Sequence, residues 1–169
     1  MSKSQSDSFS LQDIFRRSGL YGKIVLVVST WFGTGLVPVA PGTFGTLATV
    51  PLVLGLNQLG TIYKALGLAI IIAGAIWASG QYQALTGRPD PREVVIDEVA
   101  GFSLTMLLLP FSWMTLGLGF AFFRLFDILK PYPMKKLEGL RGGVGIVIDD
   151  LVAAIYAFVC VRLILFVQG

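Results

Sequence analysis

The chain of 169 residues contains no histidine, a single cysteine and few charged side chains. Without histidine, the zinc sites that proteins usually build from histidine and cysteine are not expected. Cys160 alone excludes a disulfide framework, and its position in an apolar run is typical of a buried thiol. Charged residues make up 14% of the chain, against about 25% in soluble domains. The sequence therefore predicts a membrane protein, with a soluble protein that has a buried all-helical core as the alternative.

Length and charge narrow the organisation and the partners. The net charge of +3 is mild, and the sequence has no basic run with interleaved aromatic residues of the kind that binds nucleic acid. We therefore expect no nucleic-acid partner. The length fits one domain, and we treat residues 1–169 as a single membrane domain.

The hydrophobic residues, 54% of the chain, fall into separate stretches. These stretches cover residues 24–38, 46–59, 62–79, 99–110, 113–126 and 146–167. Several are shorter than the roughly 20 residues that cross a bilayer as a helix. Pro38 and Pro41 remove backbone donors, so the first stretch cannot continue as one helix. We expect an all-α membrane helix bundle with about five crossings and a broken or re-entrant N-terminal helix over 24–45.

The N-terminal segment is polar and then amphipathic. Residues 1–9 are expected to be disordered, whereas 10–19 read as a short amphipathic helix with the capping-box spacing of Ser10 and Asp13. Arg16 and Arg17 on its polar side fit an anionic membrane surface. A plain cytoplasmic cap helix explains the same pattern.

Basic residues are concentrated in three polar segments, 1–23, 81–96 and 130–145, and the turns near 60 and 110 carry only Lys64. With five crossings, the three basic segments lie on one side of the membrane. The positive-inside rule assigns that side to the cytoplasm.

Half of the ten acidic residues lie at the edges of apolar stretches. They are Asp97, Glu98, Asp127, Asp149 and Asp150. Ionised groups in a membrane are costly, so their first interpretation is functional. All five fall at the cytoplasmic ends of expected helices, and we predict that they lie together. Taken separately, the first two could only favour a helix macrodipole, and Arg124–Asp127 could be a structural ion pair.

Five carboxylates in one place repel one another and need cations. Arg124 and Lys130 flank Asp127 in the sequence and supply two positive charges. A hard divalent cation is the other source, and Mg²⁺ binds oxygen ligands. Carboxylates, basic residues and Mg²⁺ together are equipment for phosphoryl chemistry. A small membrane transporter or ion channel, which also uses intramembrane carboxylates, is the rival class.

Four blocks of sequence carry these features, at 33–46, 96–101, 123–133 and 142–153. The first is rich in glycine and proline, the second holds Asp97 and Glu98, the third holds Asp127, and the last holds Asp149 and Asp150. In this order they resemble the phosphatidylglycerophosphatase A family. The glycines at 142, 143 and 145 fit either a tight entry to a helix or a phosphate-binding turn.

The resemblance implies a Mg²⁺-dependent hydrolase of the bacterial inner membrane, with several crossings and an active site facing the cytoplasm. Its substrate would be phosphatidylglycerophosphate, and its products phosphatidylglycerol and inorganic phosphate. The implied catalytic residues are Asp97, Glu98, Asp127, Asp149 and Asp150. Of these, the implied Mg²⁺ ligands are Asp97, Glu98, Asp149 and Asp150. The implied substrate contacts are Thr43, Thr46, Arg124 and Lys130.

Other lipid phosphatase chemistries lack their residues in this chain. Phosphatases of the phosphatidic-acid type use a histidine nucleophile, and cysteine phosphatases need Cys-x₅-Arg, whereas Cys160 is followed six positions later by Phe166. No Asp-x-Asp triplet occurs either. We expect direct metal-assisted hydrolysis, with a phospho-aspartyl intermediate as the alternative.

Overall fold

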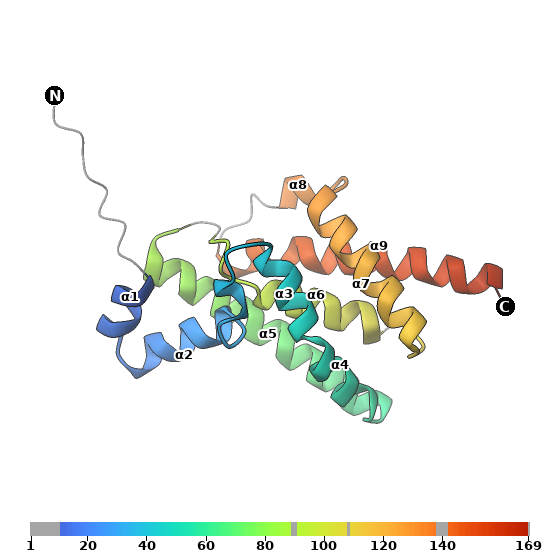
Figure 1. The fold of residues 1–169 in the computed structure, drawn as a ribbon, viewed down its shortest axis with the longest axis horizontal. Coiled ribbons are helices and arrows are strands. Elements are labelled where there is room, and N and C mark those ends of the chain that lie inside the picture. The colour runs from blue at the N-terminus through green and yellow to red at the C-terminus, as the bar shows by residue number, and fades with distance from the viewer. Residues whose placement is uncertain (1–10, 89–90, 108, 138–141, 169) are drawn as a thin grey trace.

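The computed structural model describes residues 11–88, 91–107, 109–137 and 142–168, and over these residues it is all-helical. The elements are α1 (Leu11–Arg17), α2 (Leu20–Ser29), η1 (Thr34–Leu36), α3 (Pro41–Ala48), α4 (Val50–Asn57), α5 (Thr61–Thr86), α6 (Ile96–Leu107), α7 (Trp113–Leu129), α8 (Met134–Leu137) and α9 (Gly143–Gln168). In Figure 1, α1 and α2 lie at one end of the molecule, and the C-terminal end of α9 lies at the other. The all-α prediction is confirmed.

The N-terminal region is broken, as predicted for 24–45. Helix α2 ends at Ser29, and the chain reverses through Trp31 and Phe32, whose φ angles of 44° and 57° are left-handed. After η1, a left-handed Ala40 precedes Pro41, the first residue of α3. Helix α1 confirms the short helix expected within 10–19, while the disorder expected for 1–9 concerns residues outside the described part of the chain.

Helix α5 corrects one predicted boundary, because it continues to Thr86 where a polar loop was expected from residue 81. The polar residues after Ser79 mark the end of an apolar run, and the helix itself goes on. Tyr82 is fully buried, and its hydroxyl donates to Glu93 Oε1 at 3.1 Å. The helix ends at Gly87, which has the left-handed conformation (φ +69°) of a common C-terminal stop.

The core lies where α6 packs against α5, α7 and α9 (Figure 1). Phe102 of α6 and Phe123 of α7 are fully buried there, with ring centroids 6.0 Å apart. Gly101 allows α9 to approach, because a Cβ at this position would lie 2.8 Å from the Asp150 backbone oxygen. This close approach brings the acidic start of α6 to the acidic turn of α9.

Two helices, α5 and α9, are long and apolar enough to cross a membrane. Only 17% and 28% of their apolar windows are buried inside the protein, whereas the core helix of a soluble protein is mostly buried. The five crossings predicted from the sequence are not confirmed, because the other apolar stretches form shorter helices, such as α6 with 12 residues and α7 with 17. The stretch 46–59 is split between α3 and α4, which meet at Thr49 ahead of Pro51.

Candidate active site

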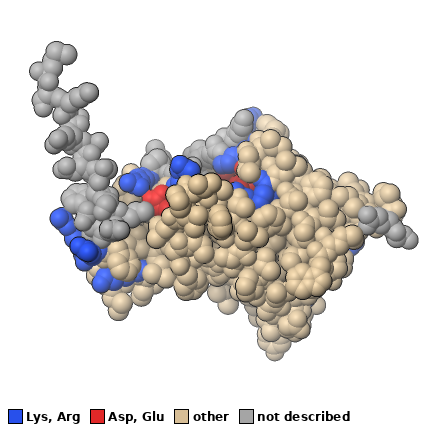
Figure 2. All heavy atoms as spheres, viewed as in Figure 1, with Lys and Arg blue, Asp and Glu red and all other residues tan. Residues whose placement is uncertain are grey.

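The five acidic residues predicted to lie together line one cavity of about 370 Å³. Asp97 and Glu98 occupy the first turn of α6, Asp127 lies near the end of α7, and Asp149 and Asp150 lie in the second turn of α9. Lys130 also lines the cavity. Figure 2 shows acidic side chains flanked by Lys and Arg on the visible face, most of which is otherwise uncharged.

Three carboxylates form the closest group. Oxygen atoms of Asp97, Glu98 and Asp150 all lie within 4.8 Å of one another. The Asp150 side chain is almost fully buried, and its Oδ2, like Glu98 Oε2, has no hydrogen-bond partner among the described residues. A buried, unpaired carboxylate oxygen is costly. Three oxygen donors, two of them carrying unsatisfied atoms, fit a hard cation such as Mg²⁺.

The remaining two carboxylates each bind a basic side chain. Asp127 forms an ion pair with Arg124 three residues earlier on α7. Asp149 Oδ2 accepts from Lys130 Nζ at 2.7 Å. Arg124 also reaches toward Glu98, with Nη1 3.6 Å from Oε1. Asp149 therefore binds Lys130, whereas the adjacent Asp150 belongs to the group of three carboxylates. Arg124 and Lys130 together supply two positive charges for five carboxylates.

Lys130 owes its position to the end of α7. It has φ 44° and ψ 63° at the C-terminal cap, and its backbone N–H donates to Phe126 O. A non-glycine residue in this left-handed region is uncommon and costs of the order of 1 kcal/mol or more. Pro131 then prevents α7 from continuing. The turn places Lys130 on the cavity beside Asp149.

The glycine-rich block 33–46 reaches the site through the start of α3. A Cβ at Gly42 would overlap Glu98 Oε1 and would lie 3.0 Å from both terminal nitrogens of Arg124. The backbone of α3 therefore rests directly on the Glu98–Arg124 pair, and only glycine leaves room for it.

The two threonines of this block do not line the cavity. Thr46 is fully buried, and its hydroxyl donates to Gly42 O at 2.8 Å. Thr43 is partly buried one position after Gly42 and is not part of the cavity wall. The structure brings Arg124 and Lys130 to the acidic group, although only Lys130 lines the cavity. The Thr46 hydroxyl bonds within α3, because helical i→i−4 bonding draws it back along the helix.

Arg92 lines the cavity, although sequence reasoning treated it only as a loop charge. It is exposed, and it has no ion pair among the described residues. The available signal was its place five residues before Asp97, on the loop that leads into α6. Arg92 adds a cation at the mouth of a largely acidic cavity.

The chain is similar in sequence to known proteins. A sequence model described as Phosphatidylglycerophosphatase A matches residues 27–165. The chain is 38% identical to phosphatidylglycerophosphatase A of Haemophilus influenzae, over 80% of this chain and 85% of the relative. It is 33% identical to phosphatidylglycerophosphatase A of Escherichia coli, over 76% of each chain.

A further relative, from Bacteroides thetaiotaomicron, is provisionally named a phosphatidylinositol-3-phosphatase. The two chains are 33% identical over 85% of this chain and 95% of the relative. No solved structure matches the chain significantly. The residues matched by the family model, 27–165, contain all four sequence blocks, at 33–46, 96–101, 123–133 and 142–153. The chain therefore belongs to the phosphatidylglycerophosphatase A family, which is a family of phosphatases.

Proposed function

We propose that this protein is a Mg²⁺-dependent lipid phosphatase that hydrolyses phosphatidylglycerophosphate to phosphatidylglycerol and inorganic phosphate. It would act in the bacterial inner membrane, with its carboxylate cavity facing the cytoplasm. The observation that carries the proposal is the group of Asp97, Glu98 and Asp150, with its unsatisfied buried oxygens, beside Arg124 and Lys130. We infer the substrate from the names of two relatives, both called phosphatidylglycerophosphatase A.

Asp97, Glu98 and Asp150 would hold the metal ion. When bound, Mg²⁺ supplies positive charge that polarises the phosphoryl group and offsets the charge that develops on it. Asp149 was also expected as a ligand, and its Oδ2 accepts from Lys130 Nζ. We propose that it holds the lysine ammonium at the cavity wall.

Arg124 and Lys130 would bind the phosphate oxygens. Arg124 Nε is buried and has no hydrogen-bond partner among the described residues, so a donor is available on the guanidinium. Lys130 Nζ, held at 2.7 Å from Asp149, contributes a point charge. Charge-assisted bonds of this kind are about twice as strong as neutral ones.

Hydrolysis would proceed by attack of a water oxygen on phosphorus, with cleavage of the bond between phosphorus and the glycerol oxygen. One water proton would pass to a carboxylate, and the leaving glycerol oxygen would gain a proton to become a hydroxyl. Asp127 is the better candidate base, because it lines the cavity but lies outside the group of Asp97, Glu98 and Asp150. Its carboxylate contacts Arg124, so the proposed base lies beside a proposed phosphate-binding cation.

The transporter alternative is less well supported. The carboxylates lie in the first two turns of α6 and α9 and near the end of α7, so they gather at the ends of helices. Transporter sites usually lie near the bilayer midplane, at the interface of two repeats. No internal repeat is evident in this sequence.

The test is phosphate release by the purified protein in detergent, with short-chain phosphatidylglycerophosphate as substrate. We expect release with Mg²⁺ and none after chelation, with recovery when Mg²⁺ is restored. Phosphatidylinositol 3-phosphate belongs in the same assay, because one relative is named for that substrate. A higher kcat/KM on the inositol lipid would identify that lipid as the preferred substrate. Full activity in chelator would refute the proposed Mg²⁺ requirement.

A further inference from the structure

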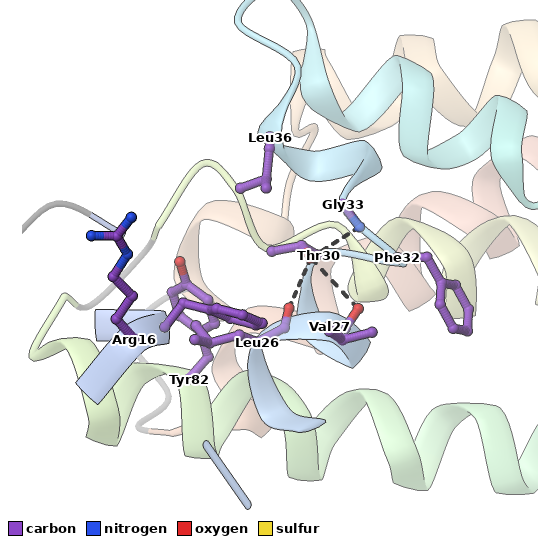
Figure 3. Close-up of a pocket in the computed structure, with 9 residues that line it drawn as sticks. Arg16, Leu26, Val27, Thr30, Phe32, Gly33, Leu36 and Tyr82 are labelled. Carbon is purple, nitrogen blue, oxygen red and sulfur yellow. Dashed lines mark hydrogen bonds between the residues drawn. The ribbon is translucent and has the colours of Figure 1, made fainter. Parts of the chain in front are cut away.

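A second cavity, of about 600 Å³, lies at the N-terminal end of the molecule, between α1, α2, η1 and the Tyr82 region of α5 (Figure 3). Its size is within the range of about 300–1,000 Å³ that is usual for small-molecule sites. We infer that this cavity, named here the apolar pocket, holds an acyl chain of the lipid phosphomonoester whose phosphate enters the carboxylate cavity. The inference rests on the proposed function and extends it to the other end of the substrate.

The lining of the apolar pocket suits a hydrocarbon chain. Leu26, Val27 and Leu36 contribute aliphatic surface. The Thr30 hydroxyl donates to Leu26 O at 2.8 Å and accepts from Gly33 N–H at 3.2 Å, so it needs no ligand (Figure 3). The Tyr82 hydroxyl, as described above, donates to Glu93. The Thr30 and Tyr82 hydroxyls are thus satisfied within the protein, and apart from Arg16 the wall offers a ligand mainly apolar contact.

The entrance of the apolar pocket is open and apolar, with one cation. Phe32 is 74% exposed and Leu36 55% exposed. Large exposed apolar side chains around a cavity mark an interaction site, and in a membrane protein they can face lipid. Arg16, from α1, lines the same cavity and is exposed, with no ion pair among the described residues. A hydrocarbon pocket with a guanidinium at its edge complements an anionic phospholipid.

One short backbone segment connects the two cavities. Glu93 bonds to Tyr82, whose side chain forms part of the apolar pocket. The residues on either side of Glu93, Arg92 and Val94, line the carboxylate cavity. Val95 N–H donates to Ser29 O of α2 at 3.0 Å, which fixes the same segment to the helix that carries the pocket lining.

Residues 92–94 therefore link the two cavities, because Arg92 and Val94 line one and Glu93 bonds to a lining residue of the other. A lipid phosphomonoester has the same division, since its scissile phosphate and its acyl chains are at opposite ends. The carboxylate cavity takes the charged end and the apolar pocket takes a chain. Binding energy from a remote part of the substrate can then be used to hold the phosphate in position.

The experiment compares two substrates with the same phosphorylated headgroup, one with long acyl chains in mixed micelles and one without acyl chains. Val27→Trp narrows the apolar pocket from α2, and Leu36→Asn makes its wall polar. Ile24→Trp is the matched control, because Ile24 is 47% exposed on the same helix and does not line the pocket.

We expect Val27→Trp and Leu36→Asn each to lower kcat/KM for the long-chain lipid by about tenfold or more, since each buried CH₂ contributes to lipid binding. Hydrolysis of the substrate without chains should stay within about twofold of wild type, a change of about 0.4 kcal/mol in the activation barrier. Ile24→Trp should resemble wild type on both substrates. Equal effects of Leu36→Asn on the two substrates, or an effect of Ile24→Trp as large as that of Val27→Trp, would overturn the inference. Hydrolysis of neither substrate by the wild-type protein would instead refute the proposed function.

Discussion

Gly42 at the start of α3 lies against the Glu98 carboxylate of α6, so closely that an added Cβ would overlap Glu98 Oε1. The same Cβ would crowd the Arg124 guanidinium. Gly42 thus packs against the Glu98–Arg124 pair, and its lack of a side chain leaves space for both residues.

Gly42→Ala should lower kcat/KM by about tenfold to a hundredfold, because displacement of catalytic groups by about 1 Å has effects of this size. The measurement is phosphate release, with thermal stability followed in parallel. Gly55→Ala in α4 is the control, since a Cβ there meets nothing within 4 Å. Wild-type activity in Gly42→Ala would show that the Glu98–Arg124 pair can move without harm.

Asp150→Asn should lower turnover by at least about a hundredfold, as expected for the loss of one preorganised charged group. It should also raise the Mg²⁺ concentration needed for half-maximal activity. Thermal stability in chelator should stay the same or rise, because the substitution removes one charge from a group of crowded carboxylates. Near-normal turnover with an unchanged Mg²⁺ requirement would remove Asp150 from the site.

Substitution of one or both partners of the Arg124–Asp127 ion pair distinguishes a structural from a functional role of the pair. Each side chain is 14% exposed, and removal of one partner from such a pair is expected to cost about 3 kcal/mol of stability. Arg124→Leu/Asp127→Leu should recover part of this loss, although Glu98 then lacks its nearby cation. Activity should remain absent in the double variant. Activity is measured by phosphate release and stability by thermal denaturation. Restored activity in the double variant would show that the pair has only a structural role.

Lys130→Gln should lower kcat/KM for the phospholipid while the Mg²⁺ requirement changes little, because its ammonium contacts Asp149 and lies outside the closest carboxylate group. Lys136→Gln is the matched control, since Lys136 is exposed and lies over the Tyr132 ring, away from the cavity wall. Equal kinetics in the two variants would place the phosphate contacts elsewhere.

The orientation in the membrane can be tested with single cysteines in a Cys160→Ala background. Arg88→Cys and Lys136→Cys should react with an impermeant thiol reagent only from the cytoplasmic side, whereas Thr61→Cys should react only from the opposite side. All three positions are exposed. Labelling of positions 88 and 136 from different sides would contradict the proposed topology and the cytoplasmic site.

Several features followed from the sequence because they depend on local chemistry. Pro38, Pro41 and the nearby glycines require a break in the N-terminal helix, and the break is present between α2 and α3. The five carboxylates at the edges of apolar stretches were expected to gather, and they line one cavity. The end of α5 was placed too early, because hydropathy reports where apolar residues stop and a helix ends only where its hydrogen bonding stops.

Tertiary structure alone decided which groups meet. Successive helical residues point about 100° apart, so the rotation of α9 determines that Asp150 faces Asp97 and Glu98 while Asp149 binds Lys130. The sequence marked Thr46 as a substrate contact, but helical hydrogen bonding turns its hydroxyl toward Gly42 O. The apolar pocket joins Tyr82 of α5 to the consecutive elements α1, α2 and η1, which come much earlier in the chain, and only their packing creates it. The sequence by itself determined the types of residue and their places on helices, whereas packing determined their partners.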